Sequence, residues 1–353
     1  MNKFFQLSQQ DRIEIINQVV IHKRLPPEAI EKDIWVTAVL RSLFTLPYSE
    51  HVSFKGGTSL SKCWNLIERF SEDVDIAINR EYFGFHGEIF TIKQISKNLR
   101  KSCCKFCRNT LQFDLAKQMI ADGIDEKLFS VSMDITNITT VDPEKISIEY
   151  KSLFVDNQIN SEENYIKPVV VLEINGRSMK EPLERVEIKS FVDEVFAGKT
   201  FIDNAFVVSV VAPERTFLEK VCLLHEEFAK QDKNIRVDRM SRHLYDVVQM
   251  LDTPISEKAL NNTDLYKSII AHRRMFIAMK DFDYDTLYPA TINIIPPENI
   301  IAKWEEDYEK MQKMIYGESL SFDKLINRIK QLNEKINRIT QKPDKSGKIM
   351  QRL

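Results

Sequence analysis

The sequence predicts an α/β protein with two lobes. Stretches with apolar residues at three- and four-residue spacings, typical of amphipathic helices, open the chain and fill most of its last third. Between them lie short apolar or alternating runs that are typical of strands. At 353 residues the chain is long enough for two domains. We therefore expect a first lobe over residues 1–212 and a helical lobe over residues 213–353.

The first predicted elements are two helices and a strand. Apolar residues recur with helical spacing over residues 11–20, and a second helix is expected after Pro26 and Pro27. The run from His51 to Phe54 is predicted to be the first strand, which delivers Lys55 to a tight turn.

The next stretch combines a glycine turn with a short helix. Gly56 and Gly57 lack a Cβ atom, so the backbone can bend sharply there and approach a ligand closely. The amide groups that open the helix are natural donors to an anion. We expect Thr58 or Ser59 to cap the helix, whose apolar spacing continues as far as Ile67.

The strand that follows carries two acidic residues. Val74, Ile76 and Ile78 are apolar and alternate with the residues between them. Because strand side chains alternate between faces, Asp73 and Asp75 are predicted to lie together on the face away from the core. Adjacent carboxylates repel each other, and a Mg²⁺ ion bound by them and by substrate phosphates relieves the repulsion. The sequence therefore predicts a phosphate and magnesium site.

This ordered series of residues resembles a known family. The Gly-Gly-Thr-Ser turn, the helix and the string Arg69-x-Ser71-x-Asp73-Val74-Asp75 resemble the first motif of the AbiEii/AbiGii nucleotidyltransferase toxins. These toxins belong to the DNA polymerase β-like nucleotidyltransferase superfamily. The resemblance implies a polymerase β-like mixed sheet with flanking helices in the first lobe. In one departure, the turn and Asp73 are separated by a spacing at or beyond the long end of the superfamily pattern.

Two segments of the second lobe resemble further motifs of the family. Residues 214–220 resemble the third motif, in which a helical lysine meets the nucleotide's phosphates, and this implies such a role for Lys220. The segment from Arg242 to Asp246 resembles the fourth motif. The resemblance marks Asp246 as a site residue and leaves its role open, whether it orients Lys220 or the acceptor. His243 is expected to pack against the helix or lie at the surface rather than bind a metal. The helical lobe is thus expected to complete the active-site cleft.

In the family's fold a third carboxylate lies on a strand beside the Asp-x-Asp pair. Glu173 lies in the apolar strand predicted over residues 167–175, where an unpaired carboxylate is costly unless water or a cation is near. Glu187 is the rival candidate. Lys189 can pair with Glu187, whereas Arg177 is the basic residue close to Glu173 in sequence. We therefore favour Glu173.

These inferences define one predicted site. The predicted catalytic residues are Asp73, Asp75, Lys220 and Asp246. The predicted nucleotide-binding residues are Lys55, Gly56, Gly57, Thr58, Ser59 and Lys220. The predicted metal ligands are Asp73, Asp75 and Glu173. For Lys55, an ordinary solvated side chain remains the alternative.

The rest of the chain suggests no second site. Residues 91–113 contain six basic and no acidic residues, which suits either contact with an RNA backbone or a solvated helix face. A strand is predicted from Phe129 to Ile135, and the polar stretch from Thr136 to Asn164, which contains Pro143, is expected to include a surface excursion. A basic, frayed tail is expected after residue 340.

Composition and charge describe an ordinary globular protein. The net charge is -2, and the sequence shows neither a signal peptide nor an apolar run long enough to span a bilayer, so a cytoplasmic location is expected. The five cysteines are expected to be reduced thiols, and a zinc site at the cluster Cys103, Cys104 and Cys107 is the alternative.

The resemblance implies a magnesium-dependent nucleotidyltransferase that uses an NTP. It implies a toxin of a type IV toxin-antitoxin or abortive-infection pair with an AbiEi-like antitoxin, which need not form a stable complex, and an RNA acceptor such as tRNA. The alternatives are nucleotidylation of a protein or small molecule, and a non-catalytic NTP-binding module. The sequence leaves the NTP, the acceptor and the oligomeric state open.

Overall fold

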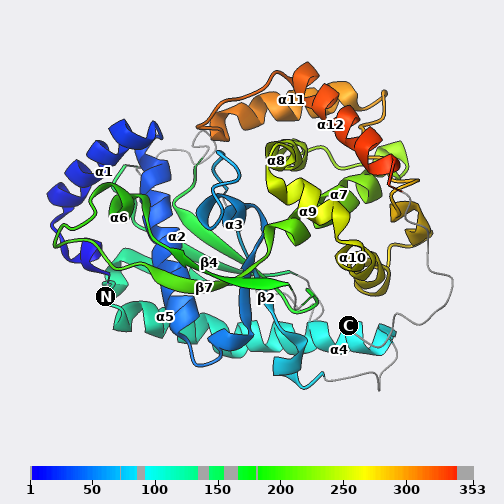
Figure 1. Ribbon diagram of the computed structural model, residues 1–353. Coiled ribbons are helices and arrows are strands. Elements are labelled where there is room, and N and C mark those ends of the chain that lie inside the picture. The colour runs from blue at the N-terminus through cyan, green and yellow to red at the C-terminus, as the bar shows by residue number, and fades with distance from the viewer. Residues whose placement is uncertain are drawn as a thin grey trace. The chain divides into compact units, whose positions relative to one another are not determined.

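The computed structural model describes residues 2–71, 73–85, 92–133, 143–154, 166–179 and 182–339, and for residues 92–96 it describes the backbone only. The predicted basic tail lies outside these residues. The chain forms two compact units (Figure 1). Unit 1 comprises Met1–Cys63 and Phe70–Val211, and unit 2 comprises Trp64–Arg69 and Ala212–Leu353.

Unit 1 is built on a mixed sheet of seven strands in the order β3-β4-β5-β2-β1-β7-β6. Their bounds are Val52–Lys55 (β1), Asp73–Ile78 (β2), Phe129–Ser132 (β3), Glu144–Tyr150 (β4), Val169–Asn175 (β5), Leu183–Ile188 (β6) and Phe206–Val211 (β7). The pairs β1/β7 and β2/β5 are parallel and the other four are antiparallel. The predicted α/β class with a mixed sheet is confirmed.

The helices of unit 1 are α1 (Gln9–Lys23), α2 (Pro27–Thr45), α3 (Gly56–Lys62), α4 (Ile92–Phe106), α5 (Gln112–Ala121) and α6 (Phe191–Val195). One face of the sheet packs against α2, whose Trp35 stacks on Tyr150 with ring centroids 4.9 Å apart. The apolar residues of β2 and β5 at positions 74, 76, 172 and 174 are fully buried on this face. Such apolar burial is the main stabilising contribution to a core. The predicted helices near the N-terminus are confirmed.

The structure of this unit contains one strand that was not predicted and one helix that is shorter than expected. The polar stretch expected to include a surface excursion contains β4, whose residues Ile146, Ile148 and Tyr150 are buried between β3 and β5. The alternation of these residues indicated a strand, but the polar residues around them obscured it. The helix after the glycine turn ends at Lys62 rather than continuing to Ile67, and Asn65 then adopts a left-handed φ of 50°.

Unit 2 is helical. Its helices are α7 (Pro213–Phe228), α8 (Ser241–Leu251), α9 (Pro254–Asn261), α10 (Thr263–Phe276), α11 (Ile301–Met311) and α12 (Phe322–Asn337). Pro213 occupies the first turn of α7, where its missing N–H costs no hydrogen bond. Trp304, Tyr308 and Phe217 lie in the core. The short segment Trp64–Arg69 joins this unit through a bridge between Arg69 and Ile315.

Two smaller expectations concern the cysteines and the membrane. The five cysteines are free thiols, and Cys103, Cys104 and Cys107 are buried. None of the helices in the described part of the chain has the length and apolarity that a membrane crossing requires.

Candidate active site

Four charged side chains form a row across neighbouring strands of unit 1. Lys145 of β4 pairs with Glu173 of β5, Glu173 with Asp75 of β2, and Asp75 with Lys55 of β1. Residues paired in this way point to the same face of the sheet, about 5 Å apart. The row therefore sets two carboxylates between two ammonium groups, and Asp73 lies two residues along β2 on the same face.

Gly56 lies directly against one of these carboxylates. Its φ is +77°, a left-handed backbone conformation that residues with a Cβ atom rarely adopt. A Cβ atom added there would lie 1.9 Å from Oδ2 of Asp75, so only glycine allows the carboxylate its present position. The turn and the acidic strand therefore pack directly against each other.

Replacement of Gly56 by alanine tests this packing. We expect Gly56→Ala to lower the free energy of unfolding by more than about 2 kcal/mol, because it combines left-handed strain of about 1–2 kcal/mol with a clash. Gly84→Ala is the matched control, because Gly84 has a φ of +79° with no atom within 4 Å of its added Cβ. Urea unfolding of both variants measures the difference. Equal losses would show that Gly56 is not needed for the approach to Asp75.

The hydroxyl groups of Thr58 and Ser59, which follow the turn, form hydrogen bonds within the protein. The N-cap of α3 is Lys55, and neither Thr58 nor Ser59 caps the helix, so that expectation is wrong. Thr58 donates its hydroxyl to the carbonyl of Asp73, and Ser59 Oγ donates to the carbonyl of Gly56 at 2.8 Å. Both side chains are buried, and Ser59 has no exposed surface. Thr58 thus ties α3 to β2 and Ser59 ties it to the turn, so both hydroxyl groups are used inside the protein.

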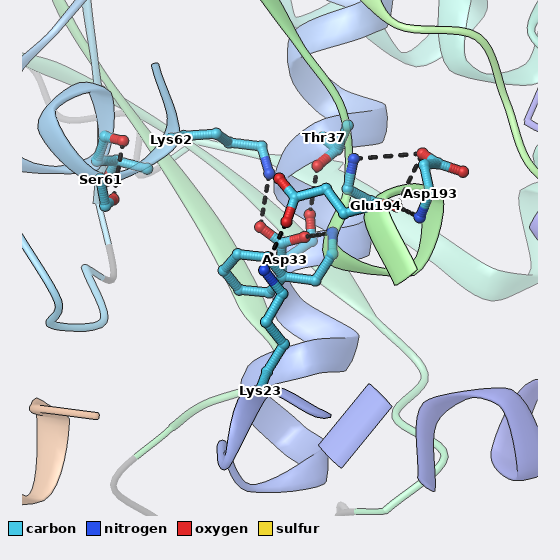
Figure 2. Close-up of polar contacts among 10 residues, drawn as sticks. Lys23, Asp33, Thr37, Ser61, Lys62, Asp193 and Glu194 are labelled. Atoms are coloured by element: carbon cyan, nitrogen blue, oxygen red, sulfur yellow. Dashed lines mark hydrogen bonds and ion pairs between the residues drawn. The ribbon is translucent and has the colours of Figure 1, made fainter. Parts of the chain in front are cut away.

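The far end of α3 is anchored by a nearly buried ion pair. Lys62 Nζ lies 2.6 Å from Oδ1 of Asp33 on α2, and both side chains are less than a tenth exposed. Oδ2 of Asp33 accepts the amide of Phe191, the first residue of α6. Figure 2 shows Lys62 reaching toward Asp33, with Lys23 and Glu194 beside them. The helix that carries the glycine turn is thus fixed at both ends.

The strand order separates the two candidates for a third carboxylate. Glu173 is directly beside Asp75, whereas Glu187 is exposed on β6 at the edge of the sheet, with β1 and β7 between it and β2. Glu173 Oε1 lies 2.6 Å from Nζ of Lys145, a partner that no sequence spacing indicated. The strand order therefore places Glu173, and not Glu187, beside Asp75.

The donor set on this face fits a hard divalent cation. Asp73 and Asp75 share the face, and Mg²⁺ typically takes one or two carboxylates and completes its shell with water and substrate phosphates. No cluster of three or more His, Cys, Asp or Glu side chains poised as metal ligands occurs among the described residues. The arrangement suits an ion that arrives with a phosphate ligand rather than one held in a protein cage.

Lys220 of α7 and Asp246 of α8 meet inside unit 2. Lys220 Nζ lies 2.9 Å from Oδ2 of Asp246. Arg69 donates to both oxygens of the same carboxylate, from Nε at 2.7 Å and from Nη2 at 2.8 Å. Asp246 has no exposed surface, and Lys220 is 7% exposed. Asp246 therefore has no surface for a nucleotide to touch, and its contacts fix the positions of Lys220 and Arg69.

Burial and charge determine the protonation states of this cluster. Burial alone would raise the pKa of Asp246, but the charges of Arg69 and Lys220 outweigh it and hold that pKa below its ordinary value. Burial lowers the pKa of Lys220, and Asp246 opposes this shift. Burial, with the charges of Lys220 and Arg242, holds the pKa of His243 well below its ordinary value.

His243 is therefore neutral at pH 7, and its Nδ1 accepts a hydrogen bond from Lys220 Nζ at 3.3 Å. The contact of His243 with Lys220 and the ion pair of Arg69 were missed, because both depend on folding rather than on spacing.

A mixed sheet with paired aspartates beside a Gly-Gly turn agrees with the nucleotidyltransferase class that the sequence motifs imply. Residues 38–328 match the profile of the family described as the nucleotidyl transferase AbiEii toxin of type IV toxin-antitoxin systems. Because the match spans well over half of the chain, the protein belongs to this family of nucleotidyltransferase toxins. The family and the enzyme class expected from the sequence motifs are confirmed.

Solved structures with similar folds share little sequence with this chain. JHP933 from Helicobacter pylori is 13% identical, with a TM-score of 0.41 over 89% of this chain and 93% of that chain. The nucleotidyltransferase toxin MenT4 from Mycobacterium tuberculosis H37Rv is 15% identical, with a TM-score of 0.45 over 91% of this chain and 98% of that chain. No curated protein matches the sequence.

Proposed function

We propose that the protein transfers a nucleotide from an NTP to an RNA acceptor in a magnesium-dependent reaction. The observation that carries this proposal is the pair Asp73 and Asp75, held on one face of β2 against a glycine whose missing Cβ makes room for the carboxylate. The reaction would take place in the cytoplasm, with a separately encoded AbiEi-like antitoxin as its counterpart.

In this proposal Asp73 and Asp75, with Glu173 beside them, would hold Mg²⁺. When bound, the ion would neutralise phosphate charge and lower the pKa of the acceptor hydroxyl. The triphosphate lies against the backbone of Gly56 and Gly57, which is fixed by the bonds of Thr58 and Ser59 to β2 and to the turn itself. Fixed dipoles of this kind stabilise developing charge without reorganising.

Lys55 and Lys220 supply positive charge in the same proposal. Lys55 is half-buried beside Asp75 and would contact the triphosphate. Lys220 balances charge on the departing pyrophosphate, held in place by Asp246 and His243. Arg69, the other partner of Asp246, is separated from Asp73 by only three residues in sequence. A single short stretch of chain therefore carries one residue of each charge cluster.

The test is incubation of the purified protein with Mg²⁺, total tRNA and each α-labelled NTP in turn. We expect label in the RNA fraction, pyrophosphate release, and loss of both when EDTA removes the metal. A parallel reaction with protein extract in place of RNA tests the acceptor class. Label in the protein fraction would overturn the RNA acceptor, and NTP binding without pyrophosphate release would overturn the enzymatic reaction.

A further inference from the structure

One exposed helical face of unit 1 is rich in lysine. The helices α4 and α5 are joined by the π-helical turn Cys107–Leu111 into one helical run from Ile92 to Ala121. Seven Lys or Arg residues and one acidic residue lie in this run, although the whole chain has a net charge of -2. Such an imbalance in an otherwise balanced protein indicates an anionic partner.

Four lysines of this run share one exposed face. The exposed residues recur every four positions, and they include Lys97, Lys101, Lys105 and Lys117, which we call the lysine face. Lys97 and Lys117 are twenty positions apart, and a helix extends about 30 Å over that separation. In an α-helix of about 3.6 residues per turn, residues spaced by four move gradually around the helix axis. The π-helical turn contains one more residue than an α-helical turn and so counteracts this movement.

The other charged residues of this helical run do not neutralise the positive charge of the lysine face. Asp114, the acidic residue of the run, is half-buried and accepts a hydrogen bond from the hydroxyl of Tyr48 at 3.2 Å. Arg108 turns inward to Glu144, which is 3% exposed on β4, at 3.2 Å. The inward Arg108 thus balances the buried carboxylate, and the exposed lysines remain on the surface.

An aromatic ring interrupts the lysine face. Phe113 is 54% exposed and Ile120 is 45% exposed, and both lie between or beside its lysines. A large apolar side chain that is exposed to water does not contribute to the stability of the core. An exposed aromatic ring among cations can, however, stack on an unpaired base of a nucleic acid. Lysines with an interleaved aromatic residue suit a nucleic-acid backbone better than an acidic peptide.

We propose that the lysine face binds the phosphate backbone of the RNA acceptor, with Phe113 stacking on an unpaired base. The proposal rests on the proposed function for its choice of RNA. Arg108 pairs with Glu144 on the buried face of β4, whereas Lys145 and Asp75 point to the other face. The lysine face and Asp75 therefore lie on opposite sides of the sheet, and the RNA that reaches both is a long folded one.

The test uses the full chain with Asp75→Asn to prevent turnover, total tRNA as the probe and no NTP. One variant changes all four lysines of the lysine face to glutamine. We expect tRNA binding to weaken about 100-fold at 0.15 M salt, and the slope of log affinity against log salt to become shallower by about 3. Phe113→Ser should weaken binding about fivefold or more.

The matched control changes four exposed lysines of α11 and α12 to glutamine, with the same loss of charge. These are Lys303, Lys310, Lys324 and Lys330. We expect this control to bind tRNA within about threefold of the parent. Equal losses in the two variants would overturn the proposal, as would polyglutamate that competes as well as RNA.

The experiments distinguish a failure of RNA binding by the lysine face from a failure of the proposed nucleotide transfer. If RNA is labelled by wild-type protein but the lysine variant binds tRNA like the parent, the lysine face is wrong and the transfer reaction stands. If tRNA binds through the lysine face but no RNA is labelled, the transfer to RNA is wrong and the surface stands.

Discussion

Replacement of Asp73 or Asp75 by alanine is expected to abolish NTP-dependent labelling of an acceptor while the protein remains folded. Each carboxylate would hold the metal ion that stabilises the negative charge developing in the transition state. Without that stabilisation the activation barrier rises by several kcal/mol. We expect a fall of about 1000-fold or more in the rate of label transfer, measured with α-labelled NTP at saturating Mg²⁺.

The fold of these variants should not suffer. Asp73 and Asp75 are like charges on one face of β2, with Glu173 beside Asp75, and such charges repel in the absence of a cation. Lys55 beside Asp75 offsets part of this repulsion, so removal of one carboxylate should leave the midpoint of urea unfolding nearly unchanged. Glu187→Ala, an exposed position on the edge strand β6, is the control and should retain transfer activity.

Asp246→Asn is expected to destabilise the protein by about 3–5 kcal/mol. The carboxylate has no exposed surface and contacts both Arg69 and Lys220, so its replacement removes the anionic group that both buried positive charges bind. The buried Lys220 would then favour its neutral form, so transfer activity should fall as well. Urea unfolding followed by tryptophan fluorescence measures the stability, since Trp304 is buried in the same unit.

The pH dependence gives this prediction a second readout. The folded-state pKa of Asp246 lies below its ordinary value, so its stabilising contribution is present above the unfolded-state pKa of about 4. That contribution is lost as the pH falls below this value toward the folded-state pKa. The stability difference between wild type and Asp246→Asn should therefore be constant from pH 5 to 8 and shrink below pH 4. Asp252→Asn, an exposed position, should show no such difference.

Local patterns were sufficient to predict the acidic strand and the glycine turn. The alternation around Asp73 and Asp75 depends on neighbouring residues alone, and Gly56 is required by its own φ and by a contact with the next strand. The preference for Glu173 over Glu187 agrees with the strand order. These features depend on short stretches of chain in which propensity and burial agree.

Long-range contacts account for what the sequence did not show. The partner of Asp246 is Arg69, 177 residues away in the chain, and Lys145 reaches Glu173 only because β4 lies next to β5. The helical spacing as far as Ile67 was misleading, because residues 64–69 leave the helix and pack with unit 2. Tertiary contacts of this kind override local periodicity.

The most direct test of the central claim is the labelling assay run side by side on wild type, Asp73→Ala, Asp75→Ala and Glu187→Ala. Each protein is incubated with Mg²⁺, α-labelled NTP and total tRNA, and labelled RNA and released pyrophosphate are counted. We expect both products from wild type and Glu187→Ala, and neither above background from the two aspartate variants. Normal turnover by either purified aspartate variant would contradict the assignment of the active site to this strand.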